Sequence, residues 1–109
     1  MQPQGHVQVL LNMLRSGMNP QLALDAPRVC VGGTYTPGAV VVNVEDGISE
    51  EVVEGLRKKG HDVTVLKGTQ RSLFGRGQIV LCSHDQDEGG RRVWSAGSDP
   101  RGDGHAIGY

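Results

Sequence analysis

Residues 40–66, VVVNVEDGISEEVVEGLRKKGHDVTVL, decide the fold class. The β-branched run Val40–Val44 predicts a strand that is buried on both faces. The alternation in Asp62–Leu66 predicts a second strand, with Val63 and Val65 on one side. Residues 45–61, between the two strands, carry the start and stop signals of a helix. The stretch therefore predicts a strand–helix–strand unit.

The helix of this unit has a clear beginning and end. Ser49 is suited to the N-cap, and acidic residues follow it in the first turn, where the helix dipole favours negative charge. Basic residues fill the last turn before Gly60, which ends the helix. Its expected inner face consists of residues at the spacing i, i+4 and i+8, namely Ile48, Val52 and Leu56.

Two helices are expected before this unit. Residues Val7–Ser16 place apolar side chains at helical spacing (Val7, Leu10, Leu11 and Leu14), and Gly17 stands where a left-handed C-terminal cap belongs. Asn19 and Pro20 then begin a second, short helix that ends at Leu24, because the residue before Pro27 is pushed out of helical geometry.

Further strands are expected on both sides of the unit. Residues Arg28–Gly38 are typical of a strand end followed by a loop. Gln78–Cys82 and Arg92–Ala96 predict a hairpin or two neighbouring strands, separated by the polar surface loop Ser83–Gly90. The whole chain, residues 1–109, thus predicts one α/β domain with at least four strands and three helices.

Length and charge exclude several classes of protein. The 109 residues suffice for one small domain. Eleven Lys plus Arg against twelve Asp plus Glu give a net charge of -1, so a general nucleic-acid binder is not expected. The longest apolar runs, Val7–Leu11 and Ala39–Val42, fall far short of the roughly 20 residues that cross a bilayer. The amino terminus carries no readable secretory signal, so the cellular location is left open.

The composition also predicts a small core. The chain has 17 glycines, which is about twice the usual share, and its aromatic residues are one Trp, two Tyr and one Phe. Glycine raises the entropic cost of ordering the backbone and adds no side-chain area to bury. We therefore expect the chain to depend on a partner for part of its packing.

The two cysteines do not form a recognisable site. Cys30 and Cys82 lack the CxxC spacing of a zinc site, and one possible pair does not make a disulfide scaffold. Their valine and leucine neighbours favour small buried side chains in strands. A disulfide or a reactive thiol stays open as an alternative.

No metal or cofactor site is expected. Residues Asp85–Gly90 faintly resemble the start of a calcium loop, but the twelfth position, which needs a bidentate Glu, is Ala96. The histidines lack the spacing that would pair two of them on one helical face: His6, His61, His84 and His105.

Three other motifs also favour plain structural interpretations. Phe74–Gln78 contains a short Gly-x-Gly, but it leads into a strand, whereas a dinucleotide site needs a helix there. Arg101–Asp103 spells an integrin-binding tripeptide in a Gly-rich tail, where a turn is the better interpretation. No Ser, Cys or Thr lies in a recognisable nucleophile context. Composition and spacing alone predict no catalytic machinery.

Several separate motifs stand in a fixed order along the chain: Met1–Asn12, Gly17–Gln21, Ala23–Arg28, Phe74–Ile79, Gly97–Gly104 and the terminal pair Gly108 and Tyr109. With these motifs the chain resembles the C-terminal part of the small subunit of the γ-glutamyltranspeptidase family. The resemblance covers residues 1–109, and the loops Cys30–Pro37 and Ser83–Arg91 are its least typical parts.

The resemblance implies both a fold and a reaction. The family belongs to the N-terminal-nucleophile hydrolases, with a four-layer αββα sandwich formed from a precursor that cleaves itself into two subunits. A terminal Thr attacks the γ-glutamyl amide of glutathione or a similar compound, and the acyl-enzyme passes to water or an amine. The Thr lies upstream of the region matched by Met1, and the oxyanion glycines come just before the stretch matched by Met1–Gln4. By resemblance the chain is thus part of an enzyme, with no catalytic, cofactor-binding or metal-binding residue of its own.

The resemblance also implies supporting roles. The implied partners are the rest of the small subunit and the large subunit. The amino end of the helix at Val7–Ser16, near Pro3–His6, would direct a partial positive charge toward the developing oxyanion. The strands at Val40, Val63, Gln78 and Arg92 would complete one sheet of the sandwich.

Three hypotheses therefore stand. The chain is a C-terminal segment or truncated copy of a γ-glutamyltransferase or glutathione hydrolase, active only within a longer polypeptide. Alternatively, it is a stand-alone binding or regulatory domain without the chemistry. The third hypothesis is an autonomous enzyme whose residues the sequence does not reveal.

Overall fold

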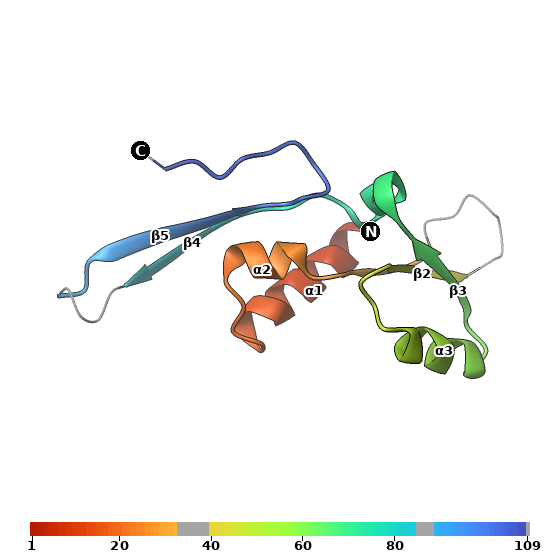
Figure 1. Ribbon diagram of the computed structural model, residues 1–109. Coiled ribbons are helices and arrows are strands. Elements are labelled where there is room, and N and C mark those ends of the chain that lie inside the picture. Colours follow the sequence, from red (N-terminus) through yellow and green to blue (C-terminus); the bar gives the residue numbers. More distant parts are fainter. Residues whose placement is uncertain (33–39, 85–88, 109) are drawn as a thin grey trace. The chain divides into compact units, whose positions relative to one another are not determined.

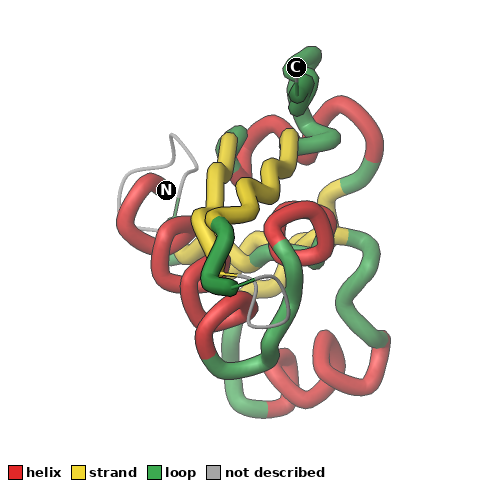
Figure 2. The backbone as a smooth tube through the Cα atoms, turned by 90° about the vertical axis from the view of Figure 1, so that its left-hand side faces the viewer, coloured by secondary structure: helices red, strands yellow, loops and turns green. Residues whose placement is uncertain are grey.

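A computed structural model of the chain describes residues 1–32, 40–84 and 89–108. The chain divides into two compact units: residues 1–8 with 26–75, and residues 9–25 with 76–109. Helix α1 (Gln2–Leu14) begins in the first unit and ends in the second. Figure 2 follows the backbone through the helices, strands and connecting turns. Each unit has its own sheet and its own buried residues.

The first unit contains a three-stranded sheet with the order β1-β2-β3. Strand β1 (Val29–Val31) runs antiparallel to β2 (Val41–Glu45), and β2 runs parallel to β3 (Asp62–Leu66). Helix α3 (Glu50–Lys58) makes the crossover between the two parallel strands (Figure 1). The predicted strand–helix–strand unit is confirmed.

Local signals set the ends of α3. The Ser49 side chain accepts a hydrogen bond from the backbone N–H of Val52 at 3.4 Å, as a helix N-cap does. Gly60 follows the helix with a φ of 88°, a left-handed conformation that glycine adopts without strain. Glu50 begins the helix at its positive end, and Arg57 and Lys58 close it at its negative end.

The core of this unit differs in one position from the expected helix face. Four valines form it: Val42, Val44, Val53 and Val63. Ile48 and Leu56 pack against them as predicted, but Val52 is 51% exposed, so its place on the inner face was wrong. The helix begins at Glu50, and Val53 and Leu56 then share a face at i, i+3, which turns Val52 toward solvent.

A 3-10 helix, η1 (Gly68–Phe74), follows β3 and was not predicted. Its sequence, GTQRSLF, has no apolar repeat that would reveal it. The segment ends in Phe74, which is 1% exposed and is the largest fully buried side chain among the described residues. A single buried aromatic residue therefore secures this turn.

The second unit contains a two-stranded antiparallel ribbon. Strand β4 (Gln78–His84) and strand β5 (Arg92–Ser98) lie side by side, each two residues longer than predicted (Figure 1). Helix α2 (Pro20–Asp25) contacts both strands, and Asn19 caps it by accepting a hydrogen bond from Leu22 N–H at 2.9 Å. The predicted hairpin and the second short helix are both confirmed.

Helix α1 is confirmed as a helix, with a shifted beginning. It starts at Gln2 instead of Val7, and Gly17 after it has a φ of 65°, as a left-handed cap requires. Proline near the start does not interrupt it, because the first turn of a helix needs no N–H donor.

The implied arrangement of the strands at Val40, Val63, Gln78 and Arg92 in one sheet is wrong for the described residues. The first two belong with β1 in the three-stranded sheet, whereas β4 and β5 pair only with each other. One physical reason lies at β1, whose outer backbone groups already bond to side chains of α1. The edge of β1 that faces away from β2 is thus occupied by α1.

Candidate functional site

The side chains considered as metal ligands from the sequence do not form a cluster in the described residues. Within residues 1–32, 40–84 and 89–108, no group of three or more His, Cys, Asp or Glu side chains is placed to hold a metal ion. The four histidines are exposed on different segments: His6, His61, His84 and His105. Asp85–Glu88, the start of the calcium-like loop, lies outside the described residues. So does most of Cys30–Pro37, one of the two loops in which the family resemblance is least typical.

The two cysteines have different environments. Cys30 is 1% exposed in β1, which confirms the interpretation as a small buried side chain. Cys82 lies in β4 and is partly exposed. Both are free thiols.

The tripeptide Arg101–Asp103 forms a turn, as expected. The Arg101 side chain is 1% exposed, and its guanidinium Nη1 donates to the Leu24 carbonyl oxygen at 2.7 Å. A receptor for the tripeptide needs this side chain accessible. The burial of Arg101 therefore removes the integrin-type interpretation.

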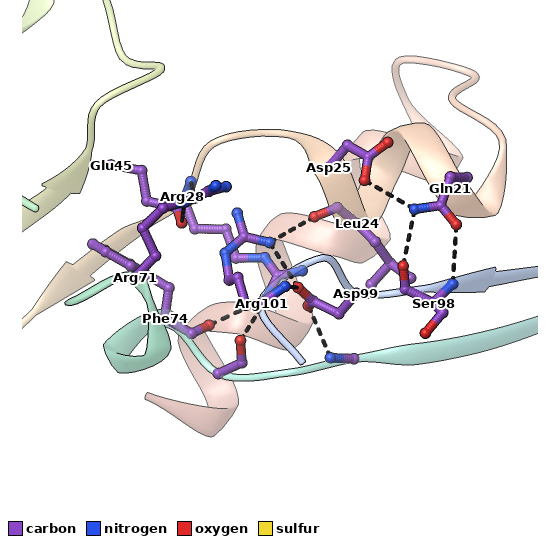
Figure 3. A network of polar contacts seen from close by, with 12 residues as sticks. Gln21, Leu24, Asp25, Arg28, Glu45, Arg71, Phe74, Ser98, Asp99 and Arg101 are labelled. Atoms are coloured by element: carbon purple, nitrogen blue, oxygen red, sulfur yellow. Dashed lines mark hydrogen bonds and ion pairs between the residues drawn. The ribbon is translucent and has the colours of Figure 1, made fainter. Parts of the chain in front are cut away.

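The described residues include two clusters of buried charge, one in each unit, drawn in Figure 3. The first is centred on Glu45 at the end of β2, which is 0% exposed. One carboxylate oxygen accepts from the backbone N–H of Arg28 at 2.7 Å, and the other accepts from Arg71 Nε at 2.8 Å. Glu45 thereby ties the residue before β1 to η1.

Arg28 extends the first cluster. Its side chain is held by the end of η1, because Nη1 donates to the carbonyl oxygens of Phe74 at 3.2 Å and Gly75 at 3.3 Å. These carbonyls belong to the last turn of a helical segment, where hydrogen-bond acceptors lack intrahelical donors. Arg28 satisfies them, so its backbone binds Glu45 and its side chain binds the end of η1.

The second cluster is centred on Asp99, directly after β5, and Asp99 is 1% exposed. Its Oδ2 accepts from the backbone N–H of Gly77 at 2.9 Å, and its Oδ1 accepts from Arg101 N and Arg101 Nη1, each at 3.0 Å. Arg101 then reaches the carboxyl end of α2 through Leu24. The pair joins the start of β4, the end of β5 and α2.

These clusters join segments that lie far apart in the sequence. Both oxygens of each carboxylate accept hydrogen bonds from this chain, and each of the two residues is at most 1% exposed. Buried carboxylates are tolerated only where such donors compensate for lost hydration. Gly77 shows how tight the second cluster is, since a Cβ there would lie 2.7 Å from Leu24 Cδ2.

Sequence reasoning did not identify the charged groups of these clusters as a unit. The sequence marks the residues of these clusters only indirectly, through the motifs of the family resemblance. Arg28, Phe74, Gly75, Gly77, Asp99 and Arg101 all lie in the stretches that carry the family resemblance. A partner far along the chain leaves no spacing pattern, so the pairing itself had to come from the structure.

Large apolar side chains are exposed in both units. Helix α1 has no buried residue, and its apolar stripe, Val7, Leu10, Leu11 and Leu14, is 46–81% exposed. On the ribbon, Val80 is 69% exposed and Trp94 is 64% exposed. Contiguous exposed apolar side chains of this kind are typical of interaction surfaces.

The described residues thus form a mixed α/β polypeptide with two buried ion-pair clusters and exposed apolar stripes. None of the helices they form has both the length and the apolar character needed to span a membrane. A sequence profile of the gamma-glutamyltranspeptidase family matches residues 1–109. The chain belongs to this family.

Two curated relatives match almost the whole chain. The glutathione hydrolase-like YwrD proenzyme of Bacillus subtilis is 34% identical over 107 residues, which are 98% of this chain and 19% of the relative. The oxamate amidohydrolase proenzyme of Klebsiella pneumoniae is 28% identical over 108 residues, or 99% of this chain and 19% of the relative. The chain therefore spans about a fifth of the curated relatives it matches.

Solved structures match the fold. A cephalosporin acylase from Bacillus halodurans has a TM-score of 0.71 at 36% identity, covering 98% of this chain and 18% of that chain. A gamma-glutamyltranspeptidase from Helicobacter pylori also has a TM-score of 0.71, at 22% identity, covering 92% of this chain and 48% of that chain. The chain matches part of each of these larger structures.

Proposed function

We propose that the chain is the C-terminal part of the small subunit of a γ-glutamyltransferase or glutathione hydrolase. In this proposal residues 1–109 are part of one domain of a longer polypeptide, within an αββα sandwich. The observation that carries it is the family match over the whole chain. The names of both curated relatives describe proenzymes, which supports a precursor that matures by cleavage.

The proposed reaction uses a nucleophile outside this chain. A Thr at the new amino terminus of the small subunit, upstream of Met1, attacks the γ-glutamyl amide carbon and expels the amine. Water or an acceptor amine then cleaves the acyl-enzyme. This chain supplies support for the site, and its two buried ion pairs keep the supporting elements in place.

The exposed apolar stripes support the proposed partners, which are the remainder of the small subunit and the large subunit. An isolated two-stranded ribbon is marginally stable in water. In the register of the ribbon, Val80 lies opposite Ala96 and Cys82 lies opposite Trp94, so these side chains share one face. Gly97, on the other face, approaches α2. In this proposal the face with Trp94 packs against the rest of the small subunit or the large subunit.

The substrate class is tested on the mature enzyme. Glutathione or another γ-glutamyl compound is the proposed substrate. Two other relatives are named for oxamate and for cephalosporins. Release of p-nitroaniline from γ-glutamyl-p-nitroanilide, compared with ammonia release from oxamate, distinguishes these substrates. Activity toward oxamate alone would refute the γ-glutamyl proposal.

The first experiment is the intact mass of the native polypeptide that ends in Gly97–Tyr109, captured with an antibody to that tail. We expect a species much heavier than 11.6 kDa, with Thr at its mature amino terminus. A native species of 11.6 kDa would refute the proposal and favour a stand-alone binding or regulatory domain.

A second experiment tests the ribbon face. The substitution Trp94→Ser in the longer polypeptide removes an aromatic side chain whose burial is worth about 1.5–3 kcal/mol. We expect a lower unfolding midpoint and less processed enzyme. Arg92→Ser is the matched control, because Arg92 lies two residues away on the same face of β5. Equal effects of the two substitutions would contradict a buried role for Trp94.

A further inference from the structure

A glutamine of α1 binds the backbone of β1 through both ends of its amide. Gln8 Oε1 accepts from the backbone N–H of Val29 at 2.7 Å, and Gln8 Nε2 donates to the Val29 carbonyl oxygen at 2.8 Å. A side-chain amide has the same donor and acceptor as a peptide group. Gln8 therefore makes the two hydrogen bonds that a residue of a neighbouring strand would make.

Gln4 repeats this arrangement one helical turn earlier. Its Oε1 accepts from Val31 N–H at 2.8 Å, and its Nε2 donates to the Val31 carbonyl oxygen at 3.0 Å. Four residues of α-helix rise about 6.0 Å, and two residues of strand rise about 6.4–6.8 Å. The two spacings nearly coincide, so one helix face can serve two successive outward positions of β1.

These two valines are the ones whose backbone groups face away from the sheet. Arg28 accepts from Glu45 N–H at 3.1 Å, and Gly32 donates to the Val41 carbonyl oxygen at 2.8 Å, so the even-numbered positions face β2. The next outward position before Val29 is Pro27, which has no N–H to satisfy. Two glutamines thus satisfy the outward N–H groups from Pro27 to Val31.

The second unit contains the same device. Gln21 of α2 accepts from Ser98 N–H at 3.0 Å through Oε1 and donates to the Ser98 carbonyl oxygen at 2.9 Å through Nε2. The next residue, Asp99, donates to Gly77 on the β4 side at 3.1 Å, so Ser98 faces outward. An independent occurrence at a different strand shows that the arrangement recurs in this fold.

We infer that Gln4 and Gln8 form an edge clamp, which takes the place of a neighbouring strand and closes β1 to strand addition by a second copy of the chain. An uncovered strand edge is a template for pairing with another chain. Two copies of β1 can pair antiparallel about a two-fold axis through the outward groups of Val29 and Val31. The inference concerns these backbone groups alone and does not depend on the proposed function.

The test measures hydrogen exchange at single amides in the full polypeptide that carries this chain. Gln8→Met and Gln4→Met preserve side-chain length and helix propensity but remove the hydrogen bonds. We expect Val29 N–H to exchange at least about threefold faster in the first variant, and Val31 N–H to do so in the second. Gln2→Met, the same change on an exposed residue of α1, is the control and leaves both amides unchanged.

Cys30 N–H is the internal reference, because Cys30 faces β2. A variant that unfolds the sheet accelerates Cys30 together with its neighbours, whereas loss of the clamp accelerates only the outward amide. Unchanged exchange at Val29 and Val31 in the single variants overturns the clamp.

The double variant Gln4→Met/Gln8→Met tests closure of the edge. We expect concentration-dependent dimers by sedimentation velocity, and renewed protection of Val29 and Val31 in the dimer. Monomers at every concentration, with both amides exchanging fast, overturn the blocking role. Dimers that leave the two amides unprotected form through another surface, and they overturn it as well.

Discussion

Removing one partner of the Asp99–Arg101 pair should destabilise the second unit strongly. The substitution Asp99→Ala deletes the acceptor of three hydrogen bonds, from Gly77 N, Arg101 N and Arg101 Nη1, of 2.9, 3.0 and 3.0 Å. The Arg101 side chain, 1% exposed, then keeps its charge without that carboxylate. Breaking a buried pair in this way costs about 3–5 kcal/mol.

The assay is urea unfolding of the polypeptide that carries this chain, for Asp99→Ala, Arg101→Ala and the double variant. Stability follows from the midpoint and slope of each transition. Because each single variant leaves one charge buried, the double variant should lose at least about 1 kcal/mol less than the sum of the single losses. Asp103→Ala is the control, since Asp103 is exposed and lies two residues from Arg101.

Two results would refute this reasoning. If Asp99→Ala costs no more than Asp103→Ala, the buried carboxylate contributes nothing to stability. If the losses of the single variants simply add, Asp99 and Arg101 act independently, and the pair does not join the strands to α2.

Three other perturbations test further parts of the structure. Glu45→Ala leaves the buried Arg28 N–H without its 2.7 Å acceptor and should lower the free energy of unfolding in urea by about 3–5 kcal/mol. A loss below about 0.5 kcal/mol would contradict a stabilising role for the first cluster. Gly97→Ala places a Cβ 2.8 Å from backbone atoms of α2 and should lower the free energy of unfolding by about 1–3 kcal/mol. Gly55→Ala, in the middle of α3 with open space around it, should raise it by about 0.5–1 kcal/mol. The same sign for both substitutions would contradict these packing distances. If the amino end of α1 stabilises an oxyanion, Gln2→Lys and Gln2→Glu should change acyl-transfer rates in the longer enzyme in opposite directions. Equal rates would refute that hypothesis. Gln4, in the same first turn, is left unchanged because its amide binds Val31.

The elements that sequence reasoning predicted well are those with local signals. The helix that begins at Glu50 has its cap, its charged turns and its final glycine within a dozen residues, and each of these acts on neighbouring backbone. The alternation of Asp62–Leu66 likewise gives the buried side of β3. The missed element, Gly68–Phe74, has no repeat of its own and depends on burial of one phenylalanine.

The exposed apolar stripe of α1 shows that a sequence pattern does not predict which surface packs against it. The apolar stripe of α1 correctly predicts a helix, and the usual inference from such a stripe is burial. In this chain Leu14 is 81% exposed, although it lies on that stripe. Periodicity reports which side chains share a face, but the partner of that face need not lie within the same 109 residues.

The sequence by itself determined the order of the α-helices and β-strands, the caps, the hairpin and the family, because these depend on residues close together or on motifs in a fixed order. Only the tertiary structure decided which carboxylates are buried and which glutamines bind strand edges. Gln21 and Ser98 are 77 residues apart, and nothing in either segment marks the other as its partner. Such pairings arise when the fold removes polar groups from water and they must find donors and acceptors within reach.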